Sequence, residues 1–99
     1  MTDSPKRGYW MAMVDVADAE AYSKYMAANK APLEKYGARF IVRGGRGEVL
    51  EGPQASRLVV IEFDSYQTAL DCFHSPEYQA ALLLRKVCSV AHVAIVEGV

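Results

Sequence analysis

Two neighbouring residues, His74 and Ser75, have side chains suited to acid–base or nucleophilic chemistry. His74 directly precedes Ser75-Pro76-Glu77, which is the capping, first-position and first-turn pattern of a helix. The helix dipole disfavours a cation at this place, so His74 would hold a neutral imidazole that accepts a proton. Ser75 is explained by capping and lacks a G-x-S-x-G elbow. The sequence assigns no catalytic residue, and His74 is the best candidate, although a locally hydrogen-bonded junction residue is the simpler interpretation.

A second group of candidates combines one acid with several arginines. Glu62 interrupts the otherwise apolar run 58–63, and a carboxylate there needs a cation partner, a strand end or a wet cavity. Arginines at positions 39, 43 and 57 are expected on strands near it, and Arg85 on the last helix. The simpler interpretation is a charge network that fixes a dimer. The alternative is a pocket for an anionic ligand that uses one or two of these arginines.

Aromatic residues complete the candidate set. Tyr78 lies one turn into the helix that begins at Pro76, where its hydroxyl would reach a pocket mouth or its ring would belong to the core. Trp10 lies on the first predicted strand. We therefore consider six ligand-binding candidates: Trp10, Arg57, Glu62, His74, Tyr78 and Arg85.

Metal and cofactor motifs are absent from the sequence. The two histidines form no H-x-H or H-E-x-x-H pattern, and Cys72 and Cys88 have no C-x-x-C spacing. We expect no metal, no cofactor and two reduced thiols. The polar N-terminus has no signal-peptide core, which favours a cytoplasmic protein.

Composition limits the classes of protein further. The chain has 99 residues, of which 52% are hydrophobic, and a formal net charge of −1. This size predicts a single domain over residues 1–99, with residues 1–7 flexible. The near-zero charge removes the main driving force for nucleic-acid binding, and no apolar stretch approaches the ~20 residues of a membrane span, so we expect neither partner.

The elements that must position the candidates follow from periodicity and turn residues. Asp18 is a plausible helix cap, Gly37 a stop, and Pro32 predicts a kink or break near Ala31. Asp64, with Gln67, resembles a capping box for a further helix that ends near Phe73. We expect strands at 9–16, 38–42, 48–50, 57–63 and 92–97, with 43–47 as a hairpin turn. The order is β-α-β-β-α-β, with the short strand at 48–50 making or extending the central hairpin and the second helix broken in two.

This order predicts an α+β, ferredoxin-like fold whose antiparallel sheet carries helices on one face. The first strand and the strand at 57–63 are apolar on both faces, although helices would cover only one. An apolar sheet face left in water would exceed what monomers tolerate. We therefore expect a homodimer in which two sheets face each other and form a dimeric α/β barrel.

Several stretches resemble the DUF1330 family of the dimeric α+β barrel superfamily. They are 8–10 (GYW), 36–45 (YGARFIVRGG), 57–63 (RLVVIEF) and 74–78 (HSPEY), the last leading on to Arg85. The resemblance covers almost the whole chain and implies the same fold and the back-to-back dimer. It implies little chemistry, because relatives in the superfamily include cofactor-free monooxygenases and isomerases as well as binding modules.

We therefore expect ligand binding rather than a particular reaction. We predict a homodimer that binds a small organic ligand in a cleft of a few hundred Å3 between helices and sheet, lined by His74, Tyr78, Trp10 and Arg57. Two alternatives stay open: a cofactor-free enzyme of the monooxygenase or isomerase type, and a non-catalytic structural module.

Overall fold

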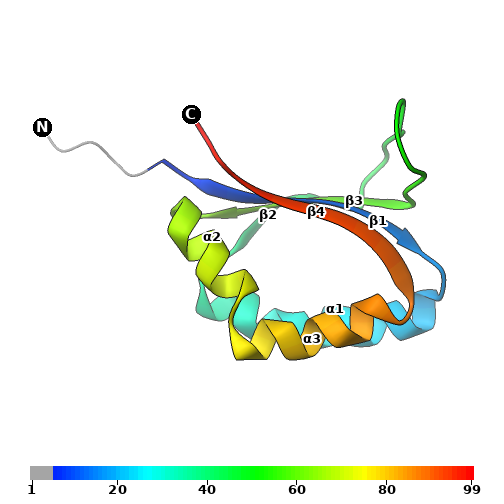
Figure 1. Ribbon diagram of the computed structural model, residues 1–99, viewed down its shortest axis with the longest axis horizontal. Helices are drawn as coiled ribbons and strands as arrows, with labels where there is room; N and C mark the ends of the chain where they lie inside the picture. The colour runs from blue at the N-terminus through cyan, green and yellow to red at the C-terminus, as the bar shows by residue number, and fades with distance from the viewer. Residues whose placement is uncertain (1–5) are drawn as a thin grey trace, which may run out of the picture.

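Four antiparallel strands form one sheet in the order β2-β3-β1-β4, and three helices pack on one of its faces (Figure 1). The computed structural model describes residues 6–99. Along the chain the elements are β1 (Gly8–Val16), α1 (Ala19–Lys35), β2 (Arg39–Arg43), β3 (Arg57–Phe63), α2 (Tyr66–Phe73), α3 (Pro76–Lys86) and β4 (Ser89–Glu97). The predicted ferredoxin-like α+β arrangement is confirmed. No helix in residues 6–99 is long and apolar enough to cross a membrane.

The predicted flexibility of residues 1–7 concerns mainly residues that lie outside the described part of the chain. Of the two that lie inside it, Arg7 has a defined contact, since its Nη1 donates to Asp64 Oδ1 at 2.9 Å.

The predicted strand at 48–50 is wrong. No strand forms between Arg43 and Arg57, and this segment is a long loop that projects from one end of the sheet (Figure 1). Instead β2 pairs directly with β3, with Phe40 opposite Ile61. A three-residue strand between two glycine-containing turns offers few ladder hydrogen bonds, and its Leu50 is 85% exposed, so pairing there would bury little.

Helix ends follow the predicted capping chemistry in two of three cases. Asp18 Oδ1 accepts from Ala21 N at 3.1 Å, and Ser75 Oγ accepts from Tyr78 N at 3.2 Å. The cap of α2 is Ser65 rather than Asp64, because the Ser65 hydroxyl accepts from Thr68 N at 3.0 Å. Asp64 instead forms ion pairs with two arginines.

Helix α1 continues through Pro32, so the predicted break into two helical pieces is wrong. Proline removes one helical hydrogen bond, and its ring crowds the preceding turn. Here the ring is buried, and the Pro32 carbonyl contacts the Cys72 thiol of α2 at 3.7 Å. Burial of the ring offsets the local cost of the proline.

The two faces of the sheet differ in what covers them. On the inner face, alternate residues of β1 and β3 pack under the helices, including Trp10, Val14 and Ile61. The intervening residues of the two strands, including Met11 and Val60, face away from the helices, and Met11 is 50% exposed. The predicted two-sided apolar strands are therefore present, and no helix within residues 6–99 covers their outer side (Figure 1).

A β-bulge at Ile41 changes which way the end of β2 faces. Phe40 lies opposite Ile61 and Val42 opposite Val60, so Ile41 is an extra residue without a partner. Arg43 then lies opposite Val59, on the same inner face as Phe40. Without the extra residue, strand alternation would place Phe40 and Arg43 on opposite faces.

Candidate ligand-binding site

A small cavity of about 40 Å3 lies between the inner face of the sheet and helices α1 and α3. Every element except α2 contributes to its walls. The aromatic and polar residues that line it are Trp10, Tyr22, Tyr25, Asn29, Phe40, Arg43, Arg57, Tyr78 and Arg85. Four of the six predicted candidates, Trp10, Arg57, Tyr78 and Arg85, are therefore brought together here.

Two tyrosines on this cavity are joined by a hydrogen bond. The hydroxyls of Tyr25 on α1 and Tyr78 on α3 are 2.8 Å apart. Burial, with a further contribution from Tyr25, raises the pKa of Tyr78 well above its ordinary value, and the nearby Arg85 opposes the shift. The Tyr78 hydroxyl therefore stays protonated at neutral pH. It packs against the Trp10 indole, with ring centroids 4.8 Å apart.

The Nε atom of Arg57, at the start of β3, is buried and has no hydrogen-bond partner among the described residues. The Arg57 Cζ lies 5.7 Å from the centroid of the Tyr22 ring, a cation–π distance. Burial raises the pKa of Tyr22, and the positive charge of Arg57 opposes this shift.

Two further arginines reach the same space from different elements. Arg85 of α3 is only 7% exposed, and its Cζ lies 5.6 Å from the Tyr25 ring centroid. Arg43, turned inward by the bulge at Ile41, has its Cζ 4.2 Å from the Phe40 ring centroid. Three guanidinium groups thus line one cavity.

No carboxylate neutralises these three arginines within residues 6–99. The ion pairs of this part of the chain involve Arg7, Lys35 and Arg39 as cations. The cavity walls contain no aspartate or glutamate. The cavity therefore carries an uncompensated positive charge in a largely aromatic setting.

A larger groove of about 330 Å3 adjoins the cavity between α1 and β2. Both spaces share four lining residues: Met26, Asn29, Phe40 and Arg43. Lys30 and Glu34, which are exposed, add one charge of each sign to the groove. The volume of this groove matches the predicted few hundred Å3, but none of the four residues predicted to line the cleft, His74, Tyr78, Trp10 and Arg57, lines it. Three of them line the much smaller cavity instead.

His74 does not line the cavity, so its predicted place in the cleft is wrong. It caps the C-terminal end of α2 and is exposed. The preceding Phe73 points to the interior instead, with its ring centroid 5.7 Å from that of Trp10, and His74 packs edge-on against Phe73 from outside. Successive residues at a helix end point in different directions, and the apolar ring takes the buried one.

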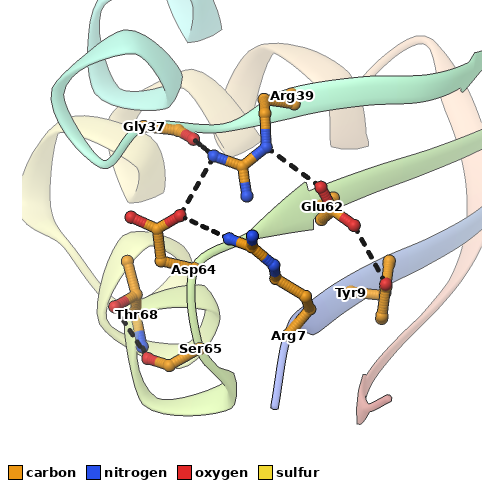
Figure 2. Close-up of polar contacts among 8 residues, drawn as sticks. All are labelled: Arg7, Tyr9, Gly37, Arg39, Glu62, Asp64, Ser65 and Thr68. Carbon is orange, nitrogen blue, oxygen red and sulfur yellow. Dashed lines mark hydrogen bonds and ion pairs between the residues drawn. The ribbon is translucent and has the colours of Figure 1, made fainter. Parts of the chain in front are cut away.

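Glu62 also lies outside the cavity, on the opposite face of the sheet (Figure 2). Its carboxylate accepts from Arg39 Nε at 3.0 Å and from Tyr9 Oη at 2.9 Å. These two hydrogen bonds, Arg39 first, lower the pKa of Glu62. Asp64 extends the cluster, because it pairs with Arg39 at 3.1 Å and with Arg7 at 2.9 Å. Glu62 thus belongs to a charge network within the chain and not to the cavity; that this network fixes a dimer stays a prediction.

Among the aromatic and polar residues of the cavity, sequence reasoning missed four: Tyr22, Tyr25, Asn29 and Phe40. A signal for the first three was present. Tyr22, Tyr25 and Asn29 recur at intervals of three and four on one face of α1, and a polar Asn29 on a buried face is unusual. Phe40 and its relation to Arg43 depend on the bulge, which leaves no clear mark in the sequence.

Within residues 6–99, no group of three or more histidine, cysteine, aspartate or glutamate residues is arranged to hold a metal ion.

Comparison with protein families matches the model of a domain of unknown function, DUF1330, over residues 7–99. The chain belongs to the DUF1330 family. No curated protein matches it. Among solved structures, a protein of unknown function from Rhodopseudomonas palustris is similar at 18% identity and a TM-score of 0.76, over 99% of this chain and 86% of that one.

Two more distant structures share the fold of this DUF1330 chain. SnoaB, a cofactor-independent oxygenase from Streptomyces nogalater, is similar at 8% identity and a TM-score of 0.64, over 95% of this chain and 94% of SnoaB. A dimeric ferredoxin-like protein of unknown function from Thermobifida fusca is similar at 13% identity and a TM-score of 0.59, over 99% and 96% of the two chains. At such identities the likeness establishes the fold.

Proposed function

We propose that this DUF1330 protein is a homodimer in which each subunit binds a small organic molecule between the helices and the sheet. The observation that carries the proposal is the aromatic cavity that adjoins the groove between α1 and β2. Small-molecule sites are mainly apolar hollows with a few convergent polar groups, and this one has Arg57, Arg85 and the Tyr25–Tyr78 pair.

The composition of the cavity walls favours binding over proton-transfer catalysis. Among the described residues, the walls contain no histidine, cysteine, aspartate or glutamate. Two tyrosines there, Tyr22 and Tyr78, hold their protons, since burial raises the pKa of both. A chain that abstracts a proton needs a base with a pKa near the working pH. SnoaB is a cofactor-independent oxygenase, and only the fold is shared with it.

The uncovered face of the sheet supports the dimer. An open apolar hollow of about 470 Å3 runs over the outer face and is lined mainly by Met11, Met13, Leu58, Val60, His92 and Ala94. Burying such a face against a second copy stabilises the pair at about 25 cal/mol per Å2 of apolar area. The Thermobifida fusca protein of the same fold is described as dimeric.

Two measurements test the two parts of this proposal. Native mass spectrometry of the freshly purified protein should show a bound small molecule that denaturing conditions release, and sedimentation velocity at micromolar concentration should show twice the chain mass. A ligand-free protein whose Trp10 indole signal responds to no aromatic compound would overturn the binding part. A stable monomer would overturn the dimer.

A further inference from the structure

We propose that the ligand of this cavity is a planar organic carboxylate whose carboxylate group lies between Arg57 and Arg85. This proposal rests on the proposed function, which requires only that some small molecule binds, and it names the chemical class.

The first step of the argument is charge. Arg57 and Arg85 line the inner cavity, and Arg43 lines both the cavity and the groove. Among residues 6–99 none of these three has a carboxylate within ion-pair distance. Arg85 is only 7% exposed and Arg57 is partly buried, and placing such cations away from water is costly unless an anion compensates for the lost hydration. An anionic ligand supplies the charge that the chain does not.

The second step is an unused donor. Arg57 Nε is buried and has no hydrogen-bond partner in the described structure. Buried donors of this kind are rare in folded proteins and call for a partner. A guanidinium presents its Nε–H and a terminal N–H side by side, which matches the two oxygens of a carboxylate.

The third step is the space around that guanidinium. Gly44 has φ +67°, and a Cβ added there would lie 2.6 Å from Arg57 Nη1. Because Gly44 has no side chain, the Arg57 guanidinium can occupy its present position beside the cavity. A larger residue would displace it.

The fourth step separates a carboxylate from a phosphate. The inner cavity, at about 40 Å3, has room for a group the size of a few water molecules. Phosphate sites commonly use free backbone N–H groups at a helix N-terminus. Tyr78 lies in the first turn of α3, but its backbone N–H already donates to the Ser75 hydroxyl at 3.2 Å and is not available to a phosphate.

The fifth step concerns the rest of the ligand. The groove that adjoins the cavity offers Phe40, Met26 and Leu33 as apolar walls. The Arg43 guanidinium stacks on the Phe40 ring at 4.2 Å and forms a flat surface beside both spaces. A flat apolar body in the groove, with its carboxylate in the cavity, fits this shape and polarity.

The test compares benzoate with its neutral isostere benzamide. Trp10 is the only tryptophan, it lines the cavity, and its indole N–H donates to the Ala69 carbonyl at 2.9 Å. One indole cross-peak in a 1H–15N spectrum therefore reports on the site. We expect benzoate to shift this peak with an affinity about ten-fold or more above that of benzamide, because a charge-assisted pair replaces neutral hydrogen bonds.

Two variants locate the effect. Arg57→Gln should weaken benzoate binding about ten-fold and leave benzamide nearly unchanged. Because Arg57 is partly buried, Arg43→Gln, at an exposed position, provides a second variant with a lower risk of misfolding and should give a smaller loss of the same kind. Arg46→Gln, in the exposed loop and on neither hollow, is the matched control and should change nothing.

The outcomes are distinguishable. Equal affinity for benzoate and benzamide would overturn the carboxylate proposal and leave the binding function intact. Stronger shifts with inorganic phosphate or phenyl phosphate than with benzoate would overturn it in favour of a phosphate site. The absence of any response, together with the absence of a co-purified molecule, would overturn the proposed function as well.

Discussion

The hydroxyls of Tyr25 and Tyr78 lie 2.8 Å apart and link α1 to α3 in the protein interior. Each ring is almost fully buried. The pair therefore both satisfies two buried polar groups and forms part of the cavity wall. Its contribution to stability can be separated from its packing by removing single oxygen atoms.

Tyr25→Phe should lower the free energy of unfolding by about 1–2 kcal/mol, because it leaves the Tyr78 hydroxyl buried without its partner. The Tyr25→Phe, Tyr78→Phe double variant should lose less than the sum of the two single losses. Urea unfolding measures all three. Tyr66→Phe, at an exposed position, is the control and should change little. Strict additivity would contradict the hydrogen bond.

Because of the charge network around Glu62, the free energy of unfolding should depend on pH in the acid range. Hydrogen bonds from Arg39 and Tyr9 lower the pKa of Glu62 below its ordinary value of 4.5, so the folded state binds this proton less tightly than the unfolded state. The contribution of Glu62 should therefore be complete above the ordinary pKa and lost as pH falls through the lowered one.

Urea midpoints of the wild type and Glu62→Gln check this dependence. The gap between them should be widest near neutral pH and should close as pH falls through the lowered pKa of Glu62. Glu48→Gln, in the exposed loop, is the matched control and should give no such gap. A gap that widens on acidification would show that the sign is wrong.

Gly8 on β1 lies close to the backbone at the start of α2. A Cβ at this position would collide with the Ser65 carbonyl oxygen and lie 2.6 Å from the Tyr66 Cα, and both of these are backbone atoms. Gly8→Ala should therefore cost about 1–3 kcal/mol of stability, as overpacking does. At Gly45 an added Cβ meets nothing within 4 Å, so Gly45→Ala should be nearly neutral in the same thermal or urea unfolding measurement.

Cys72 should be chemically silent in the native protein. It is fully buried, and burial raises the pKa of its thiol to about 12. Because the thiolate is the reactive form, iodoacetamide at about pH 8 should leave Cys72 unmodified until urea unfolds the chain. Peptide mass spectrometry distinguishes the two states. Rapid modification without denaturant would show that α2 opens from the sheet.

The proposed dimer predicts a sharp effect at the centre of the outer sheet face. Val60→Lys should convert the dimer to a monomer, because a lysine charge would be buried between two apolar sheets. Val87→Lys, at a residue that is 83% exposed, should leave the dimer intact. Sedimentation velocity measures both variants. A dimeric Val60→Lys protein would mean that the subunits meet elsewhere.

Local chemistry allowed most of the fold to be predicted from the sequence. Ser75 followed by Pro76 is a strong start signal because it satisfies helix N–H groups within a few residues, and the structure uses it. The error at Asp64 has a long-range cause. Arg7 and Arg39, distant in the chain, take its carboxylate, and the adjacent Ser65 caps the helix.

The candidate site was less accessible because it depends on side-chain direction. Trp10, Arg57, Tyr78 and Arg85 have the side-chain types of a binding site, and the strand and helix periods place them inward. His74 and Glu62 have equally suitable chemistry, but one lies at an exposed helix end and the other on the opposite sheet face. A shift of one residue along a strand or helix is enough to move such a side chain from the cavity to the opposite face.

The extra residue at Ile41 has a consequence for comparisons between relatives. After this extra residue, the side chains of β2 that would face outward face inward instead. Arg43 therefore faces the cavity only because β2 is one residue longer than its pairing with β3 requires. A relative that aligns an arginine at this place but lacks the insertion would present that arginine to the outer face. Deletions in β2, rather than substitutions at Arg43, would then be the event that removes the charge from the cavity during evolution.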